Sequence, residues 1–248
     1  MFKKILKSFF SSAGYEIRNK KYKDIFTIRQ TMTEAFDHLK SMGFNPGLII
    51  DVGAADGTPP LQDSFPGSSF FWVEPIREFQ PQLETLKRKL NGEYLIAALG
   101  KLPGRMKINI SSDKVGSSIL NSPDQSIDNS NGREIKIDTL ENVAREKKFD
   151  QYKSILLKID VQGFELEVLE GAGNFLDNIE VIILEVSFFN FLKDCPDFYD
   201  VVVYLKKKGF VVYDIVGGIN RPRDMALGQK DLIFVKEKGL LRTSHNWE

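Results

Sequence analysis

The chain has only one cysteine and two histidines among its 248 residues. The lone Cys195 excludes an internal disulfide, and without a Cys/His cluster the sequence offers no ligand set for structural zinc, so we expect no metal site. Such cysteine usage is typical of a cytoplasmic protein. The sequence also has no run of 18 or more apolar residues, the length needed for a membrane-spanning helix.

The formal net charge of the chain is zero, because 34 basic residues balance 34 acidic ones. The molecule as a whole therefore offers no general attraction to nucleic acid, and we expect no nucleic-acid partner. The charges are unevenly spread, however. Residues 1–29 contain eight basic and two acidic residues, a net charge of +6 that the remainder balances with −6.

The same N-terminal segment has an apolar stripe at helical spacing, formed by Phe2, Ile5, Leu6 and Phe9 with lysines between them. Lys7 interrupts the continuous apolar core that a signal peptide requires. Two interpretations stay open. The segment is either a short helix packed on the domain or a basic amphipathic segment bound to the anionic inner face of a membrane.

What the sequence does contain is a strong strand-and-turn signal at residues 48–57, LIIDVGAADG. The nearly unbroken aliphatic run predicts a central strand buried on both faces. The small residues after it allow a sharp turn and a close approach to a ligand. Asp51 lies at the carboxyl end of this strand, where open α/β sheets bind their ligands.

A second apolar run, SFFWV at residues 69–73, leads directly into Glu74. Glu74 follows Asp51 by 23 residues, close to the spacing of about 20 at which nucleotide-binding folds place an acid for the ribose hydroxyls. The alternative is a solvated acid at a strand end. The pair favours a cofactor that carries a nucleoside.

Downstream, apolar runs and caps predict alternating strands and helices. Further strands are expected at 94–99, 154–159, 180–186, 210–216 and 231–235, and helices after Thr31, Pro75, Asp138, Gly163 and Asp197. The last two strands are joined by a short polar link, which predicts a hairpin and one antiparallel strand in an otherwise parallel sheet. Short β-like pieces are expected at 106–110 and 118–120, and the polar residues 111–132 predict a mobile loop.

Several pieces of the chain resemble the FkbM-type family of S-adenosylmethionine-dependent methyltransferases. They are GFNPGLIIDVGAADG, FFWVEP, YLIAALG, GSSIL, KIDVQGFELEVLEGA, EVIILEV and DLIFV, in order over roughly residues 43–236. The resemblance implies a class I methyltransferase fold, α/β and Rossmann-like. It has a seven-stranded, mostly parallel sheet with one antiparallel strand and helices on both faces. The implied divisions are an N-terminal extension at 1–42, the methyltransferase domain at 43–237 and a tail at 238–248.

The resemblance also implies which residues bind S-adenosylmethionine. The glycine turn would lie under the methionine part and Glu74 would bind the ribose; the full set is Asp51, Gly53, Ala54, Asp56, Gly57, Glu74, Pro75 and Ala98. Two positions depart from the family pattern. Asp56 replaces a frequent asparagine or histidine and adds a charge for the cofactor's ammonium group. Gln162 replaces a frequent glutamate, which weakens a catalytic role there.

Methylation of a hydroxyl needs a group that accepts the proton, and carboxylates near the predicted site offer this. Asp160, at the end of the 154–159 strand, is the first candidate; its alternative role is an N-cap. Glu165 and Glu185 are second candidates and equally suit structural or substrate-orienting roles. Ser117 and Ser118 either line the acceptor pocket or form a plain turn. Lys158, unusual inside a buried strand, is expected to pair with a neighbouring acid.

The expected function is methyl transfer from S-adenosylmethionine to an oxygen of a carbohydrate or small metabolite. One alternative is a nicotinamide-dependent oxidoreductase, although a second glycine fingerprint and a Tyr/Lys catalytic pair are missing. Another is a non-catalytic membrane-associated binding protein of the same fold, which would bind the cofactor without turning over an acceptor.

Overall fold

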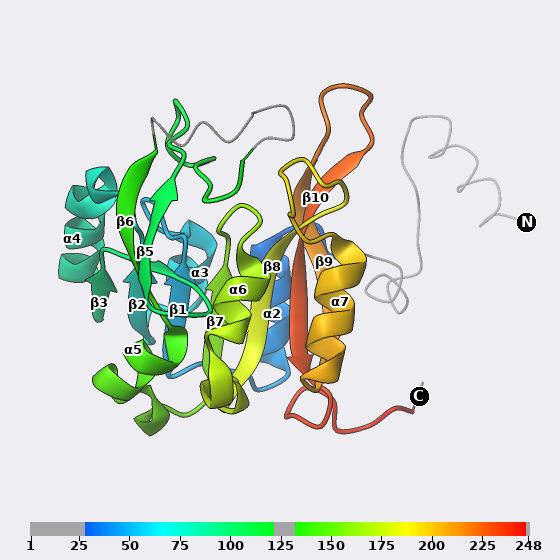
Figure 1. Cartoon of the computed structure of the whole chain (residues 1–248). Helices are drawn as coiled ribbons and strands as arrows, with labels where there is room; N and C mark the ends of the chain where they lie inside the picture. The colour runs from blue at the N-terminus through cyan, green and yellow to red at the C-terminus, as the bar shows by residue number, and fades with distance from the viewer. Residues whose placement is uncertain (1–27, 122–131, 247–248) are drawn as a thin grey trace, which may run out of the picture.

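The protein is described by a computed structural model over residues 28–121 and 132–246. Within these ranges a seven-stranded sheet runs through the middle of the molecule (Figure 1). In order across the sheet its strands are β3 (Gly92–Leu95), β2 (Ser69–Val73), β1 (Leu48–Val52), β7 (Ile155–Ile159), β8 (Ile179–Ser187), β10 (Leu227–Lys236) and β9 (Phe210–Asn220). Neighbouring strands are parallel except where β10 pairs with β8 and β9. The fold class predicted from the sequence is confirmed.

Helices cover both faces of this sheet (Figure 1). One face packs against α2 (Met32–Ser41), α3 (Pro59–Ser64) and α4 (Gln80–Lys89), and the other against α5 (Leu140–Lys147), α6 (Glu165–Glu170) and α7 (Phe198–Lys207). Short 3-10 turns are η2 (Arg77–Phe79), η4 (Phe149–Gln151) and η5 (Gly173–Asn178). A hydrophobic core lies on each face of the sheet. Because side chains alternate along a strand, Ile49 of β1 lies in the core beneath α2, α3 and α4, and Ile50 lies in the core beneath α5, α6 and α7.

The helix boundaries follow the capping signals of the sequence, with one displacement. Thr31 Oγ1 accepts a hydrogen bond from the Glu34 amide, and the Glu34 carboxylate accepts one from the Thr31 amide, which is the predicted capping box. For α5 the cap is Thr139, whose side chain accepts from the Asn142 amide, and not Asp138. Asp138 instead ends a strand.

That strand belongs to a second, three-stranded sheet that the sequence did not predict. Its order is β4 (Ala98–Leu99), β6 (Arg133–Asp138) and β5 (Gly104–Ile108). The strand expected at 94–99 is therefore divided, since β3 ends at Leu95 and β4 pairs with β6. Most of β5 is exposed, so its sequence lacks the apolar run that marks a buried strand.

The predicted hairpin is confirmed, and its strands are longer than expected. β9 and β10 pair antiparallel from Phe210 with Lys236 to Asn220 with Leu227, with interruptions of the register along the way. The extra length carries the hairpin tip beyond the end of β8 (Figure 1). Consecutive positive φ angles at Gly217 (+57°) and Gly218 (+89°) accompany the irregular pairing.

Two sequence predictions concern residues outside the described ranges. The amphipathic segment at residues 2–9 lies there, as does the part of the predicted loop from 122 to 131. In the part of the chain that is described, no helix is both long and apolar enough to cross a bilayer.

Candidate functional site

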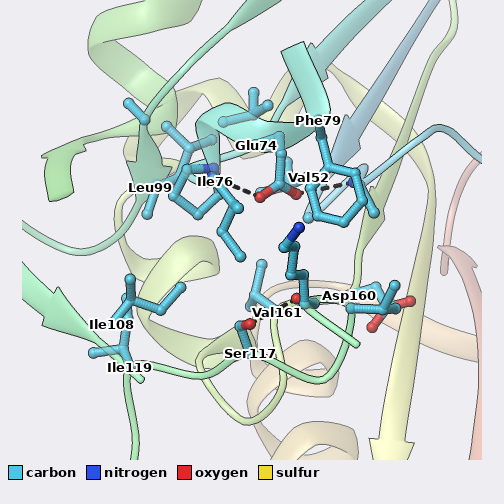
Figure 2. Close-up of a pocket in the computed structure, with 18 residues that line it drawn as sticks. Val52, Glu74, Ile76, Phe79, Leu99, Ile108, Ser117, Ile119, Asp160 and Val161 are labelled. Atoms are coloured by element: carbon cyan, nitrogen blue, oxygen red, sulfur yellow. Dashed lines mark hydrogen bonds between the residues drawn. The ribbon is translucent and has the colours of Figure 1, made fainter. Parts of the chain in front are cut away.

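A cavity opens at the carboxyl ends of β1, β2 and β7, and we call it the main cavity. Apolar side chains from both sheets and η2 form much of its wall (Figure 2). They include Val52, Ile76, Phe79, Leu99, Ile108 and Ile119. The cavity is therefore a mainly apolar slot with a few polar groups at defined points.

Glu74 supplies one of these polar groups (Figure 2). Glu74 is 4% exposed, and its carboxylate is held from two sides, because Oε2 accepts from the Ala55 amide at 2.9 Å and Oε1 from the Ile76 amide at 2.8 Å. Burial raises the pKa of Glu74 despite these bonds. Each oxygen has a second lone pair for a ligand hydroxyl. Pro75 and Ala98 line the same cavity.

The turn after β1 brings the main chain close to the β7 turn. At Gly53, with φ +74°, a Cβ atom would lie 1.9 Å from the Asp160 carbonyl oxygen, so only glycine fits. Gly53 lines the cavity. The other predicted turn residues point elsewhere: Ala54 is buried in the core beside α2, Asp56 is exposed, and Gly57 packs against α3 and α4.

Asp51 is not among the residues that line the cavity. It is 1% exposed and sits opposite Lys158 in the parallel register of β1 and β7, with 3.6 Å between Lys158 Nζ and Asp51 Oδ1. Burial raises the pKa of Asp51, and Lys158 opposes that effect. Burial alone would lower the pKa of Lys158, but Asp160 and Asp51 outweigh it and raise the pKa. Lys158 is thus paired with acids, as predicted.

Asp160 lines the same cavity as Glu74 (Figure 2). Its Oδ2 accepts from Lys158 Nζ at 3.2 Å and its Oδ1 from Gln162 Nε2 at 3.1 Å. Gln162 Nε2 also donates to Glu185 Oε2 at 3.1 Å, and Gln229 Nε2 donates to the same oxygen at 2.8 Å. Asp160 and Glu185, both predicted from sequence, are therefore joined through Gln162.

A fourth acid, Asp231, completes this cluster and was missed in the sequence. Asp231 on β10 is the register partner of Glu185 on β8. Burial and the neighbouring acid Asp160 raise the pKa of Glu185 to about 8; burial raises that of Asp231 to about 6. Asp231 stands at the start of a predicted strand, but its neighbours depend on an antiparallel register that the sequence does not reveal.

Glu165 is close in sequence but has a different environment. It is 4% exposed, and its Oε1 accepts from the Gly163 amide at 3.0 Å and the Val161 amide at 3.3 Å. Burial raises its pKa to about 7. These bonds hold the left-handed turn at Gln162 (φ 54°) and Gly163 (φ 96°), which indicates a positioning role for Glu165.

The two serines of the GSSIL motif hold the loop that borders the cavity. Ser117 lines the cavity, but its hydroxyl donates to the Lys114 carbonyl at 2.6 Å and accepts from the Ser111 amide. Ser118 donates to the Gln162 carbonyl at 2.6 Å and so ties the loop to the β7 turn. Across the described ranges, no group of three or more His, Cys, Asp and Glu side chains is placed to hold a metal ion.

Comparison with known proteins gives a family and a fold. The sequence signature of the methyltransferase FkbM domain matches residues 51–212, well over half of the chain. No curated protein matches significantly. Among solved structures, methyltransferase FkbM from Methylobacillus flagellatus is similar at 13% identity and a TM-score of 0.53, covering 83% of this chain and 48% of that one. This chain thus spans about half the length of that protein.

Two more solved structures have weaker similarity. Magnesium protoporphyrin IX methyltransferase from Synechocystis, with bound S-adenosylmethionine, has 15% identity and a TM-score of 0.45, covering 94% of this chain and 96% of that one. An rRNA methylase from Streptococcus thermophilus has 10% identity and a TM-score of 0.46, covering 85% and 98%.

Proposed function

Because the chain belongs to the FkbM methyltransferase family, we propose that it transfers a methyl group from S-adenosylmethionine to a hydroxyl oxygen of a carbohydrate or small metabolite. The observation that carries this proposal is the shared cavity of Glu74 and Asp160. It contains an acid suited to a ribose and, at the neighbouring strand end, an acid suited to receive a proton.

The cavity's own residues fit S-adenosylmethionine, the cofactor expected of this family. An adenine ring has apolar faces, which suit the wall formed by Ile76, Phe79 and Ala98. Glu74 would accept hydrogen bonds from the ribose hydroxyls, and Gly53 lets the main chain approach the methionine part. When bound, the cofactor supplies an electrophilic methyl group.

The protein's part in the chemistry is to position the acceptor and remove its proton. Lys158 and Gln162 each contact a different oxygen of Asp160, which fixes the direction of the carboxylate. A hydroxyl within hydrogen-bond reach of Asp160 would lose its proton to it as the new bond to carbon forms. Holding that oxygen in line with the methyl group supplies much of the remaining rate enhancement.

The cofactor assignment is tested by calorimetry with S-adenosylhomocysteine. Glu74→Ala should weaken binding by about 1.5–3 kcal/mol, the contribution of hydrogen bonds to a charged acceptor. Glu74→Gln, which keeps an acceptor for one backbone amide, separates charge loss from disturbance of the loop. Asp37→Ala, on the exposed face of α2, is the control. Tight binding of NAD together with no response to S-adenosylhomocysteine would contradict the proposal.

A further inference from the structure

A second hollow lies between the segment after β8 and the tip of the β9–β10 hairpin. Its wall is formed by Phe189, Phe191, Ile219 and Pro222, with Arg221, Asn220, Gly228 and Gln229 completing it. We call it the hairpin groove. None of its residues belongs to the main cavity.

The walls of the hairpin groove are held in place by contacts between the two segments. The Phe188 amide donates to the Gly228 carbonyl at 2.9 Å, and the guanidinium carbon of Arg221 lies 3.8 Å from the centre of the Phe189 ring. Arg221 Nε donates to Asp224 Oδ1 at 3.0 Å. The one charged side chain in the groove wall is therefore already paired, and the groove favours an uncharged ligand.

Large apolar side chains are left exposed here. Phe191 is 41% exposed and Ile219 is 61% exposed. Apolar groups gathered around a concave surface are typical of a binding site, because a ligand that covers them removes their surface from water.

A chain of hydrogen-bonded side chains connects the hairpin groove to the acids of the main cavity. Gln229, in the groove wall, donates to Glu185 Oε2. Gln162 donates both to that oxygen and to Asp160 Oδ1. In the order of the sheet, the groove and Glu185 therefore lie toward β8 and β10 from Asp160, whereas Glu74 lies on the opposite side of Asp160, at the end of β2. This places the groove on the acceptor's side of Asp160.

We propose, resting on the methyl transfer proposed above, that the hairpin groove binds an uncharged apolar portion of the acceptor, an alkyl chain or an aromatic ring. The acceptor hydroxyl then extends past Gln229 and Glu185 to Asp160. A bare sugar does not suit this wall, because its many hydroxyls would face Phe189, Phe191, Ile219 and Pro222. The acceptor is accordingly an amphiphilic molecule with its hydroxyl beside an apolar group.

The test compares glucosides that share a sugar and differ in their aglycone. Calorimetry on the full chain without cofactor would use n-octyl β-D-glucoside below its critical micelle concentration, phenyl β-D-glucoside and methyl β-D-glucoside. We expect saturable binding of the octyl or phenyl compound, with methyl glucoside at least about tenfold weaker because it buries far less apolar surface. Ile219→Asp and Phe191→Asp should each weaken binding of the tighter compound about tenfold or more.

Val203→Asp is the matched control, since Val203 is 50% exposed on α7 and lies outside the groove. It should leave glucoside binding unchanged. Equal binding of all three glucosides, or no effect of the groove variants, would overturn the proposal. If the protein bound none of the glucosides but bound phosphatidylcholine vesicles, and Ile219→Asp abolished that vesicle binding, the proposal would also be overturned, because the groove would then be a lipid-facing surface. S-adenosylhomocysteine binding in the same variants is a separate readout of the proposed function, so the two can fail independently.

Discussion

Asp160 differs from the other acids of the site because it alone both lines the main cavity and contacts Lys158 and Gln162. Asp51 contacts the same lysine, with 3.6 Å between Lys158 Nζ and Asp51 Oδ1. Removing the charge of Asp160 therefore leaves Lys158 with a carboxylate partner, which makes the substitution suitable for separating chemistry from folding.

Asp160→Asn should lower turnover by roughly 10²–10⁴-fold while S-adenosylhomocysteine affinity stays near that of the unmodified protein, because the amide keeps the shape and loses the basicity. The measurement is release of S-adenosylhomocysteine with an acceptor found by screening hydroxylated sugars and amphiphilic alcohols. Asp150→Asn, at an exposed position in η4, is the control. If Asp160→Asn retained most of its activity, Asp160 would have only a structural or binding role.

The raised pKa of Glu165 predicts that the free energy of unfolding depends on pH. Its pKa is raised from 4.5 to about 7 by burial, so between these values the folded protein keeps a proton that the unfolded chain releases. Stability should fall as pH rises through this window, by at most about 1.4 kcal/mol per pH unit for one proton, and level off above it.

Glu165→Gln should remove that contribution, so the difference in unfolding free energy between variant and unmodified protein changes with pH from 5 to 7. Urea titrations at several pH values measure it. Glu170→Gln, exposed at the other end of α6, should give a constant difference. A constant difference for Glu165→Gln as well would show that this carboxyl does not titrate in the window.

At the scale of elements, the three-stranded sheet is held against the helices of the main domain by a close contact between the end of α6 and the residue after β4. A Cβ atom on Gly171, the C-cap of α6, would lie 2.0 Å from the carbonyl oxygen of Gly100, just after β4. The Gly171 carbonyl also accepts from the Glu141 amide in α5. One glycine thus joins three elements.

Gly171→Ala should destabilise the protein by about 1–3 kcal/mol, the usual cost of overpacking, because the obstacle is main chain and cannot rotate away. Gly104→Ala is the control, since no atom lies within 4 Å of its Cβ position in β5, and it should stay within about 0.5 kcal/mol. Urea denaturation measures both. Equal stability of the two variants would mean that α6 and β4 separate at little cost.

The sequence predicts those elements whose signals are local. β1 and β7 are apolar runs interrupted only by Asp51 and Lys158, Thr31 and Asp197 cap their helices through neighbouring amides, and the β9–β10 link is short. Of the second sheet, only the β-like piece at 106–110 gave a signal, because its strands are largely exposed or only two residues long.

The site divides in the same way. Glu74 and Asp160 follow directly from strand ends, and the structure places both at the cavity. Asp51 has the same sequence signature, yet it does not line the cavity and instead lies 3.6 Å from Lys158, its partner across the β1–β7 pairing. Asp231 joins the cluster only through antiparallel pairing of distant strands. Local sequence patterns do not reveal how strands that are distant in the sequence pair with one another.

At the scale of the whole molecule, charge is separated along the chain, with +6 in residues 1–29 against −6 in the remainder. An apolar stripe of Phe2, Ile5, Leu6 and Phe9 accompanies the positive charge. Binding of this segment to an anionic membrane stays a prediction. Each Lys or Arg near such a surface contributes about 1 kcal/mol, and the stripe adds insertion into the bilayer.

Co-sedimentation with liposomes tests this prediction. The full chain should bind vesicles containing phosphatidylserine, bind less in high salt, and lose binding when residues 1–20 are deleted. Vesicles of phosphatidylcholine alone are the control for charge. If the full and shortened chains both stay in the supernatant at low salt, the segment does not bind the membrane, and its stripe would instead pack on the domain.

The position of β10 has a consequence for the order in which the sheet can be completed during synthesis. β10 is the last described strand to leave the ribosome, yet it lies inside the sheet, between β8 and β9. Until residues 227–236 emerge, β9 has no neighbour in that sheet and the acids of β7 and β8 lack Gln229 and Asp231. A nascent chain could therefore assemble the Glu74 side of the cavity before residues 227–236 emerge, whereas the surroundings of Asp160 and Glu185 would be complete only after them.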